Sequence, residues 1–353
     1  MVSAILMIVA IGSSAVRESE DSRSSNSQNG YIGSARCAEC HIEIGATQQR
    51  SDHAHTLRPM TDLSNLLRKL PIHFDDKENG VEYRLERSTG GAAIDLVAQK
   101  NHRRERMQLI WAFGAGRKGV TFLGKTAQGE YVQSRVSWYE KIQGLDVTTG
   151  AEVRKVQNAH DALGETQSHE ARHECFACHL TRNADLLPEK IEESSGGVQC
   201  ERCHGPGSKH AQFITEGKGS EGLAIQNPGK LGASEQLRFC GVCHRQPLEE
   251  LSKVILDNAT VRFPAQRLVL SRCYDESDGK LKCTTCHNPH ENLPTSMVVY
   301  DPKCLSCHAG KGAIGSSCPI SEKDCVACHM PREAIMKHSD FADHWIRKVR
   351  VAK

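Results

Sequence analysis

Residues Cys283–His329 read C-T-T-C-H at Cys283–His287, C-L-S-C-H at Cys304–His308 and C-V-A-C-H at Cys325–His329. In each pentapeptide, two thiols three residues apart can add to the two vinyl groups of one porphyrin. The histidine that follows then lies under the iron as its proximal ligand. This stretch therefore predicts three covalently attached c-type haems within 47 residues.

The same motif occurs four more times upstream, at Cys37–His41, Cys175–His179, Cys200–His204 and Cys240–His244. Seven copies predict seven haem c groups, each with one iron. The cysteines predicted to attach them are Cys37, Cys40, Cys175, Cys178, Cys200, Cys203, Cys240, Cys243, Cys283, Cys286, Cys304, Cys307, Cys325 and Cys328. The predicted proximal iron ligands are His41, His179, His204, His244, His287, His308 and His329.

Paired C-x-x-C motifs can also bind zinc, and a single motif can act as a redox dithiol. Neither use requires a histidine directly after the second cysteine, whereas all seven copies have one. This regularity favours covalent haem over zinc or dithiol chemistry.

Composition limits the kind of core that the chain can build. Of the 353 residues, 38% are hydrophobic and 5% are aromatic, which is low for a conventional core. Six motifs lie within residues 175–329, so the peptide there is too short to enclose each porphyrin separately. We expect the haems to pack on one another, because buried porphyrin offsets the ordering cost of a loop-rich chain. The predicted fold class is mainly α with low regular secondary structure, organised around stacked haems, with a small β-rich insert.

The β-rich insert is predicted at residues 71–159, in the long interval without a motif. Alternating or apolar runs predict strands of a small antiparallel sheet at 81–87, 92–98, 107–113, 119–123 and 131–139. The cluster G-A-G-R-K-G (114–119) resembles a phosphate-binding loop only superficially, and a hairpin turn is expected there. The predicted neighbours of the insert are a first-haem segment at 31–70 and a six-haem cytochrome domain at 160–353.

Residues 1–15 are apolar and end in small residues, which is typical of a secretory signal peptide, although a charged start is missing. The run is too short to span a bilayer, and an uncleaved anchor is the less favoured alternative. Residues 16–30 are rich in Ser, Glu and Asp and are expected to form a disordered leader. These features predict a periplasmic or otherwise extracytoplasmic protein.

Two cysteines lie outside the motifs, Cys273 and Cys318. Haem c is attached outside the bacterial cytoplasm, in a compartment that also permits disulfides. A Cys273–Cys318 bridge is the preferred hypothesis, and two unpaired thiols are the alternative.

The second axial ligand decides what each haem can do. An iron held by two histidines is low-spin and only passes electrons, whereas an open sixth position can bind a small molecule. Eleven of the eighteen histidines lie outside the motifs, enough to close all seven sites. The candidate distal ligands are His53, His169, His173, His210, His290, His338 and His344. A weaker candidate is His73, and the expected bystanders are His55, His102 and His160.

The formal net charge of +2 omits the cofactors. Two propionates on each of seven haems would take the oxidised protein to about −5, if all of them were ionised. The predicted negative charge argues against a nucleic-acid partner. The numerous Arg and Lys side chains are expected to pair with propionates.

Several segments resemble the multihaem cytochromes of the cytochrome c-554 type, including longer relatives with doubled C-x-x-C-H motifs. Y-I-G-S-A-R-C-A-E-C-H with S-D-H-A resembles the first-haem segment, and C-E-R-C-H-G-P-G-S-K-H, C-T-T-C-H-N-P-H and C-V-A-C-H-M-P-R…D-H-W-I-R resemble later segments. The resemblance covers residues 31–60 and 170–350. It implies stacked and edge-on haem pairs and a role in respiratory electron transfer. It also implies His53, His210, His290 and His344 as distal ligands.

The favoured function is electron transfer between extracytoplasmic redox partners, quinol-linked proteins or other cytochromes, through mostly bis-histidine haems. A membrane-associated complex is possible, and the oligomeric state is open. The alternative is a multihaem oxidoreductase acting on a small nitrogen or sulfur species (nitrite, hydroxylamine, tetrathionate) at one open haem. A third role, as the conducting part of a larger assembly, requires a partner chain.

Catalytic relatives guide the choice between the first two functions. Pentahaem nitrite reductase and octahaem hydroxylamine oxidoreductase mark their active haem with a C-x-x-C-K motif or a tyrosine cross-link. This sequence contains no C-x-x-C-K. The electron carrier is therefore favoured, and no catalytic residue is predicted.

Overall fold

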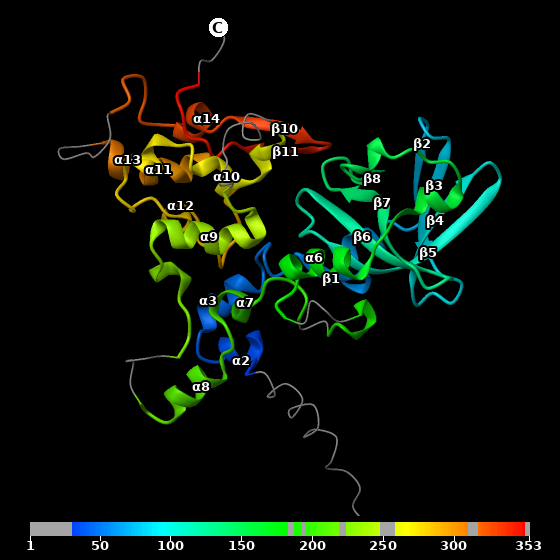
Figure 1. Cartoon of the computed structure of the whole chain (residues 1–353), viewed down its shortest axis with the longest axis horizontal. Coiled ribbons are helices and arrows are strands. Elements are labelled where there is room, and N and C mark those ends of the chain that lie inside the picture. Colours follow the sequence, from blue (N-terminus) through cyan, green and yellow to red (C-terminus); the bar gives the residue numbers. More distant parts are fainter. Residues whose placement is uncertain are drawn as a thin grey trace, which may run out of the picture.

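The computed structural model describes residues 30–182, 187–192, 195–218, 224–247, 258–309 and 317–349. The predicted signal peptide and nearly all of the predicted leader lie outside these ranges. Within them, no helix combines the length and apolar character needed to cross a membrane. The chain forms a β-sheet half and a helical half that lie side by side (Figure 1).

The sheet half consists of consecutive antiparallel strands. Each strand pairs with the next in the order β2–β8. Their bounds are β2 Ile72–Asp76, β3 Val81–Arg87, β4 Ile94–Lys100, β5 Arg103–Phe113, β6 Gly119–Thr126, β7 Tyr131–Tyr139 and β8 Gly144–Val147. Strand β1 (Leu57–Pro59) pairs with β5, and β9 (Gly164–Thr166) pairs with β7. Because β2 also contacts β8, the sheet curls into a nearly closed barrel.

Side-chain alternation explains why these segments are strands. In β3, Val81, Tyr83 and Leu85 are buried, and the charged residues between them point outward. The inward side chains of several strands join one core, which α5 (Ala159–Leu163), η1 (Met60–Asp62) and α4 (Ser64–Leu67) close off. Strands at the predicted segments and the hairpin turn at 114–119 are confirmed.

The predicted fold class is wrong. Of the described residues, 36% are helical and 23% are in strands, so the chain is not mainly α. The sheet also recruits β1 and β9, which lie outside residues 71–159. The strand-forming runs are visible in the sequence. Their closure into one barrel-like sheet depends on pairing between strands, which local alternation does not encode.

The helical half is built from short helices joined by loops. It contains α2 Ser34–Ala38, α3 Ile42–Gln48, α6 His169–His179, α7 Cys200–His204, α8 Ser208–Thr215, α9 Ala233–His244, α10 Pro264–Leu268, α11 Arg272–Asp275, α12 Cys283–Cys286, α13 Asp301–His308 and α14 Cys325–His329. Its other elements are η3 Pro188–Lys190, η5 Pro228–Lys230, η6 Asn258–Arg262, η7 Met297–Tyr300, β10 Arg332–Met336 and β11 Ser339–Ala342. The short helix η2 (Ala151–Val153) belongs to the sheet half, between β8 and α5. Six of the C-x-x-C-H motifs form or end a short helix, and the seventh connects α2 to α3.

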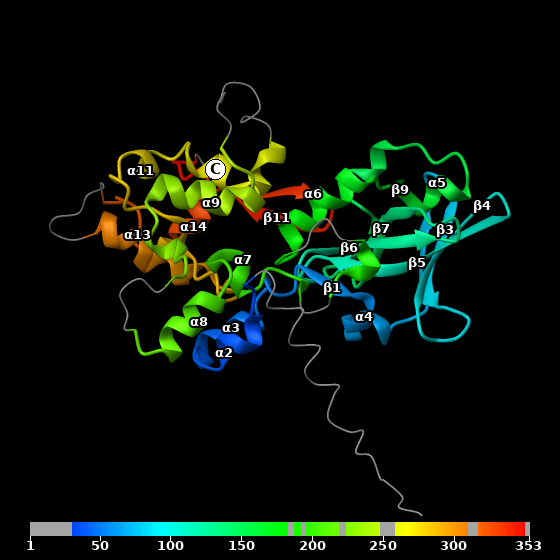
Figure 2. The same ribbon diagram turned by 60° about the horizontal axis from the view of Figure 1, so that its bottom comes forward.

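The two halves meet through α6 and through the β5–β6 turn. Phe176 and Leu180 of α6 pack with Trp111 and Leu123 on the outer face of the sheet. Arg117 in the turn forms an ion pair with Asp52, at 3.1 Å. The turned view shows α6 between the sheet and the helices that carry the other motifs (Figure 2).

Candidate functional site

Four motif histidines each lie opposite a second histidine from a distant segment. The ring centroids are 6.3 Å apart for His41–His210 and 6.1 Å for His53–His244. They are 6.0 Å apart for His204–His290 and 6.2 Å for His287–His344. The angle between ring planes varies from 8° to 74°, whereas the spacing hardly changes.

This spacing fits one metal ion between two imidazoles. A transition metal bonds an imidazole nitrogen at about 2 Å, and that nitrogen lies about 1 Å from the ring centroid. Two imidazoles on opposite sides of one iron therefore have centroids roughly 6 Å apart, whatever the angle between their planes. Direct stacking of two rings would bring their centroids closer, to as little as about 4.5 Å. The four pairs match the geometry of bis-histidine iron.

Hydrogen bonds orient several of these rings. In His204, Nδ1 lies 2.8 Å from the carbonyl oxygen of Gln226. In His53, it lies 3.1 Å from the carbonyl oxygen of Pro289, and in His344 it lies 3.1 Å from that of Ala342. A metal-binding histidine commonly donates its other ring N–H to such an acceptor. Donation from Nδ1 leaves Nε2 with its lone pair free, as an iron ligand requires.

Protonation states agree with ligation. Burial lowers the pKa of His244, His287 and His290, with neighbouring histidines adding to the effect at His244 and His290. Burial and the nearby His287 lower the pKa of His344 to about 4. These imidazoles are neutral at neutral pH, and the neutral ring is the form that binds a metal.

The second member of each pair comes from elsewhere in the chain. His53, twelve residues after the first motif, faces His244. His210, on α8, faces His41. Both views show α2, α3, α7 and α8 close together (Figures 1 and 2). This arrangement brings α8, which carries His210, near the first motif between α2 and α3. The pairs therefore interlock segments that are far apart in sequence.

Contacts between cysteines show which motifs are neighbours. The thiols of Cys37 and Cys200 lie close enough to affect each other, because Cys200 raises the pKa of Cys37 and Cys37 lowers that of Cys200. The Sγ atom of Cys243 lies 3.9 Å from the carbonyl oxygen of Cys178. Cys203 interacts electrostatically with Cys243. The motif Cys240–His244 thus has neighbours at Cys175–His179 and at Cys200–His204.

The chain of neighbours continues toward the C-terminus. Cys283 raises the pKa of the Cys240 thiol, and Cys304 raises that of Cys325, so the thiols of each pair are neighbours. Cys286 interacts electrostatically with Cys304. Six motifs therefore form one contiguous row in the order 37–41, 200–204, 240–244, 283–287, 304–308 and 325–329. The motif 175–179 lies outside this row, beside the motif 240–244.

The remaining motif histidines have other surroundings. His179 donates from Nδ1 to the carbonyl of Thr56 at 2.9 Å, and Phe113 packs edge-on against its ring at 5.2 Å. His329 donates from Nδ1 to the carbonyl of Arg347 at 3.0 Å. His308 ends α13, which packs beside α14. Second ligands for these three motifs stay a prediction.

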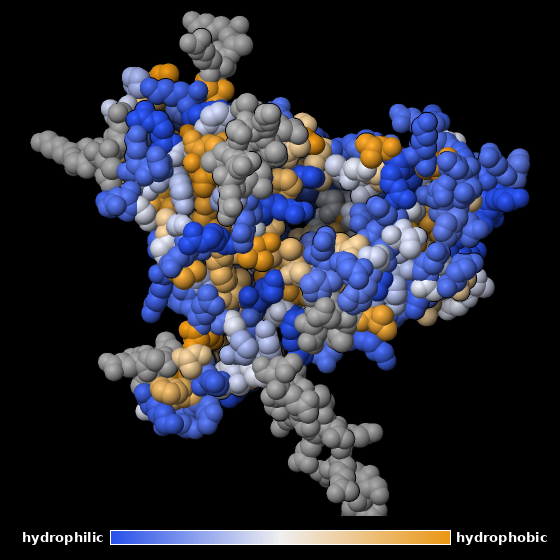
Figure 3. Space-filling view, viewed as in Figure 1, coloured by the Kyte–Doolittle hydropathy of each residue, from blue (hydrophilic) through white to orange (hydrophobic). Residues whose placement is uncertain are grey.

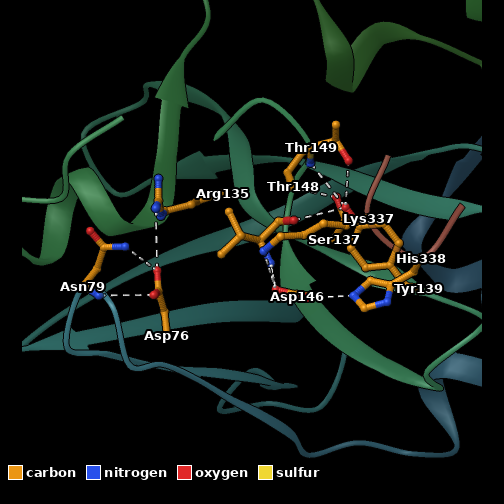
Figure 4. A network of polar contacts seen from close by, with 11 residues as sticks. Asp76, Asn79, Arg135, Ser137, Tyr139, Asp146, Thr148, Thr149, Lys337 and His338 are labelled. Carbon is orange, nitrogen blue, oxygen red and sulfur yellow. Dashed lines mark hydrogen bonds and ion pairs between the residues drawn. The ribbon is translucent and has the colours of Figure 1, made fainter. Parts of the chain in front are cut away.

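Three predicted distal ligands lie away from the four pairs. His338 is bonded through Nε2 to Asp146 of β8 at 2.7 Å, and its ring lies 5.0 Å from that of Tyr139 (Figure 4). Lys337 lies 3.4 Å from the same carboxylate. The nitrogen that an iron would need is therefore engaged with the sheet. His169 begins α6 and is exposed, and His173 lies one turn further along, partly buried.

The polar network around Asp146 joins the C-terminal segment to the sheet. Burial alone would raise the pKa of Asp146, but hydrogen bonds from His338 and the amide of Val147 outweigh it and lower the pKa. Deeper in the sheet, Asp76 lies 3.6 Å from Arg135 in a fully buried ion pair (Figure 4). His338 thus has a structural contact rather than a place beside a motif.

The weaker candidate His73 and the histidines interpreted as bystanders are in none of the four pairs formed among the described residues. His73 and the expected bystander His102 are exposed on the sheet. His160, on α5, lies 3.4 Å from Glu130. His55 donates to the carbonyl of Ser51 at 2.9 Å and lines a separate cavity with Arg58 and Gln199.

The preferred Cys273–Cys318 disulfide is wrong, because both residues are free thiols. Cys318 is exposed and lies near Lys348. Cys273 is partly buried near Cys304 and Cys307. The sequence suggested a bridge because these two cysteines remain after the motifs are assigned. Their positions in the fold set them apart, and a disulfide requires close approach.

Two buried carboxylates hold motif turns in place, and sequence reasoning missed both. The carboxylate of Glu201 accepts hydrogen bonds from the amides of Ile32 at 2.9 Å, Gly33 at 2.8 Å and Gly207 at 2.8 Å. Asp301 accepts from the amides of Asp324 at 2.8 Å and Cys325 at 2.9 Å. The signal for Glu201 is its place inside C-E-R-C-H, next to the G-P-G loop.

We expect Glu201→Ala to lower the free energy of unfolding of the haem-loaded protein by about 2–4 kcal/mol, because one buried and two partly buried amides lose a charged acceptor. Amide hydrogen exchange at Ile32 and Gly33 should accelerate. The matched control is Glu43→Ala, an exposed acidic residue beside the first motif, which should change neither quantity. Equal behaviour of the two variants would contradict this role.

The helical half fits a group that supplies apolar bulk. Its own apolar cluster of buried residues around α9 and α10 is small, whereas the sheet has an extensive core. Apolar side chains beside the motifs remain uncovered, with Ile42 70% and Val242 56% exposed. Figure 3 shows apolar residues gathered on this half, while the sheet half is largely hydrophilic on the same face. Porphyrin placed at the motifs would cover such side chains.

His244 gives a sharper test of the fit. Desolvation by neighbouring protein groups lowers its pKa, and yet its side chain is exposed, so its ring is left uncovered in the structure. Its partner is His53, at the spacing that iron requires. The residues present therefore fit haem c.

Comparisons with known proteins agree with this chemistry. The family model described as "Cytochrome c554 and c-prime" matches residues 133–205, which include the motifs Cys175–His179 and Cys200–His204. The crystal structure of the outer cell wall cytochrome OcwA resembles this chain with a TM-score of 0.51 and 15% sequence identity. The alignment covers 90% of this chain and 80% of that one, and at this identity the likeness concerns the fold. No curated protein matches the sequence.

Proposed function

We propose that the chain is a multihaem c-type cytochrome that carries seven haems and passes electrons along them between redox partners, as the partial family match and the similar fold support. The observation that carries this proposal is the set of four histidine pairs spaced at 6.0–6.3 Å. An iron closed on both sides by imidazole has no position for a substrate, so such sites serve electron transfer.

The residues assigned to this function are the motif cysteines and histidines, together with four distal ligands. The distal ligands would be His210 for the first motif, His290 for the third, His53 for the fourth and His344 for the fifth. When bound, each haem supplies a one-electron couple at iron. The chain favours the neutral form of His244, His287, His290 and His344, and it orients several of the paired rings through Nδ1.

The contiguous row of motifs supports a path for electrons. The proposed path runs from the motif 37–41, at the N-terminal end of the row, to the motif 325–329 at the other. The motif 175–179 would form a side branch at the motif 240–244. Either end of the row can then meet a different partner.

The proposed location is extracytoplasmic. Haem c is attached outside the bacterial cytoplasm, which also suits the predicted signal peptide. The similar solved structure is that of an outer cell wall cytochrome. The proposed partners are redox proteins, quinol-linked proteins or other cytochromes, with no role for nucleic acid.

The test is the intact mass of the protein matured in a host that attaches haem c, together with its ferric EPR spectrum. We expect a mass seven haems above that of the polypeptide and signals dominated by low-spin bis-histidine iron. A smaller number of haems, or a spectrum with mostly high-spin iron, would overturn the proposal.

A second candidate function rests on one observation. His179 packs against Phe113, and no described histidine ring faces it at the spacing of the four pairs. The haem attached at Cys175 and Cys178 would then keep an open position, and the protein would be an oxidoreductase for a small nitrogen or sulfur species. Turnover of nitrite, hydroxylamine or tetrathionate with a reduced dye distinguishes this function from electron transfer alone.

A further inference from the structure

Tyr300 lies beside the ring of the motif histidine His287. Its hydroxyl oxygen is 3.4 Å from Nδ1 of that ring, and the two rings meet edge to face, with centroids 5.5 Å apart and planes at 75°. His287 is in turn paired with His344 at 6.2 Å, with the ring planes at 44°. Tyr300 therefore contacts one of the two imidazoles that would close the iron attached at Cys283 and Cys286.

The direction of the hydrogen bond between Tyr300 and His287 follows from ligation. When Nε2 of an imidazole is bound to iron, Nδ1 carries the proton and donates it. The hydroxyl of Tyr300 is then the acceptor. This hydroxyl is neutral at neutral pH, because a phenol ionises only at about pH 10 and burial raises the pKa of Tyr300 further. As an iron ligand, His287 would donate to a neutral side-chain oxygen.

The acceptor at His287 differs from those at other motif histidines. In His179, His204 and His329, Nδ1 lies 2.8–3.0 Å from a backbone carbonyl oxygen. A carbonyl at that distance raises the basicity of the imidazole, which then donates more electron density to iron. The longer bond to a hydroxyl gives His287 less of this support. Weaker donation favours ferrous iron, so the acceptor at this motif is suited to a higher reduction potential than a carbonyl would give.

The chain anchors Tyr300 at this place. Tyr300 ends η7 and is followed directly by Asp301, which is 5% exposed and begins α13. Asp301 accepts hydrogen bonds from the amides of Asp324 and Cys325, and α13 itself carries the motif 304–308. One junction of two residues thus links the last three motifs of the chain. A side chain anchored in this way can fix the rotation of the ring that it contacts.

We propose that Tyr300 is a positioning residue for His287: its hydroxyl fixes the angle between the two ligand planes and tunes the reduction potential of the haem attached at Cys283 and Cys286. The inference rests on the proposed function, because it requires haem at this motif with His287 and His344 as its ligands. It goes beyond that function by assigning the setting of one potential to a residue that neither binds iron nor attaches haem.

The deciding variant is Tyr300→Phe in the full-length, haem-loaded protein, because it keeps the aromatic ring and removes only the hydroxyl. We expect one haem to become easier to reduce. Its ratio of ferrous to ferric iron at a fixed potential should rise about threefold, since a weak hydrogen bond is lost. The low-spin EPR signal of the same haem should shift, because it depends on the orientation of the two axial imidazoles. Potentiometric titration followed by EPR measures both changes.

Two further variants identify the haem and control for packing. His344→Ala opens the iron between His287 and His344, so the low-spin signal that it removes belongs to this haem. The signal that moves in Tyr300→Phe should be the same one. The matched control is Tyr274→Phe. Tyr274 lies near Cys283 of the same motif, but among the described residues it has no ring contact or hydrogen bond with a histidine. This control should leave every haem unchanged.

The outcomes separate the role of Tyr300 from the proposed function. Unchanged potentials and EPR signals in Tyr300→Phe, or equal changes in the two tyrosine variants, overturn the proposal. A shift at a haem other than the one that His344→Ala identifies also overturns it. All of these results leave the electron carrier standing, since the number of haems is measured separately by intact mass. A haem count below seven contradicts the proposed function, and absence of haem at Cys283 and Cys286 contradicts both.

Discussion

On the proposed function with seven haems, His290→Ala should convert one low-spin haem to a high-spin one and weaken the low-spin EPR intensity by about one part in seven. The reason is the pairing of His204 with His290, whose rings are nearly parallel and 6.0 Å apart. Loss of one imidazole opens the iron attached at Cys200 and Cys203. Ferric EPR with spin quantitation measures the change.

His290→Met extends the same test. A thioether in place of the second imidazole should keep the iron low-spin and raise its reduction potential, since methionine ligation favours the ferrous form. Potentiometric titration should show one haem moved to higher potential. His102→Ala is the control, because His102 is exposed on the sheet and far from the pairs. Unaltered spectra and potentials in both His290 variants would rule out this ligand assignment.

The second large effect concerns the segment that carries His344. Asp343→Ala should lower the free energy of unfolding of the haem-loaded protein by about 3–5 kcal/mol, because the buried guanidinium of Arg267 loses its carboxylate partner. The two residues form a bidentate ion pair at 2.8 and 2.6 Å, with side chains 4% and 0% exposed. Denaturant unfolding followed by far-ultraviolet circular dichroism measures the loss.

The same substitution should disturb the ligation of one iron. Asp343 precedes His344 and accepts a hydrogen bond from the amide of Trp345 at 3.0 Å, so it fixes this turn of the chain. A high-spin fraction should appear together with the loss of stability. Asp340→Ala is the matched control. Its pairs with Arg332 and Lys118 lie at the surface, so its effect should stay below about 1 kcal/mol. Similar losses in the two variants would refute the special role of the buried pair.

The haem chemistry could be inferred from the sequence because it is local. Two thiols and a histidine within five residues suffice to attach a porphyrin and to supply one ligand to its iron. Strands at 81–87 and 131–139 were also predictable, since alternation of apolar and polar residues is a property of neighbouring positions. The hydrogen bonds from the amides of residues 32 and 33 to Glu201 could not be predicted, because these partners lie in a distant segment of the chain.

By itself, the sequence indicated the kind of cofactor, and it predicted the cysteines that attach it and the proximal histidines. Only the tertiary structure decided which of the spare histidines face a motif. His210 and His338 look alike in sequence, yet one ring lies opposite His41 and the other is bonded to Asp146. The tertiary structure also decided that the strands close into a barrel-like sheet with α6 on its outer face. Both outcomes depend on contacts between residues far apart in the chain, and such contacts form only when the whole chain packs.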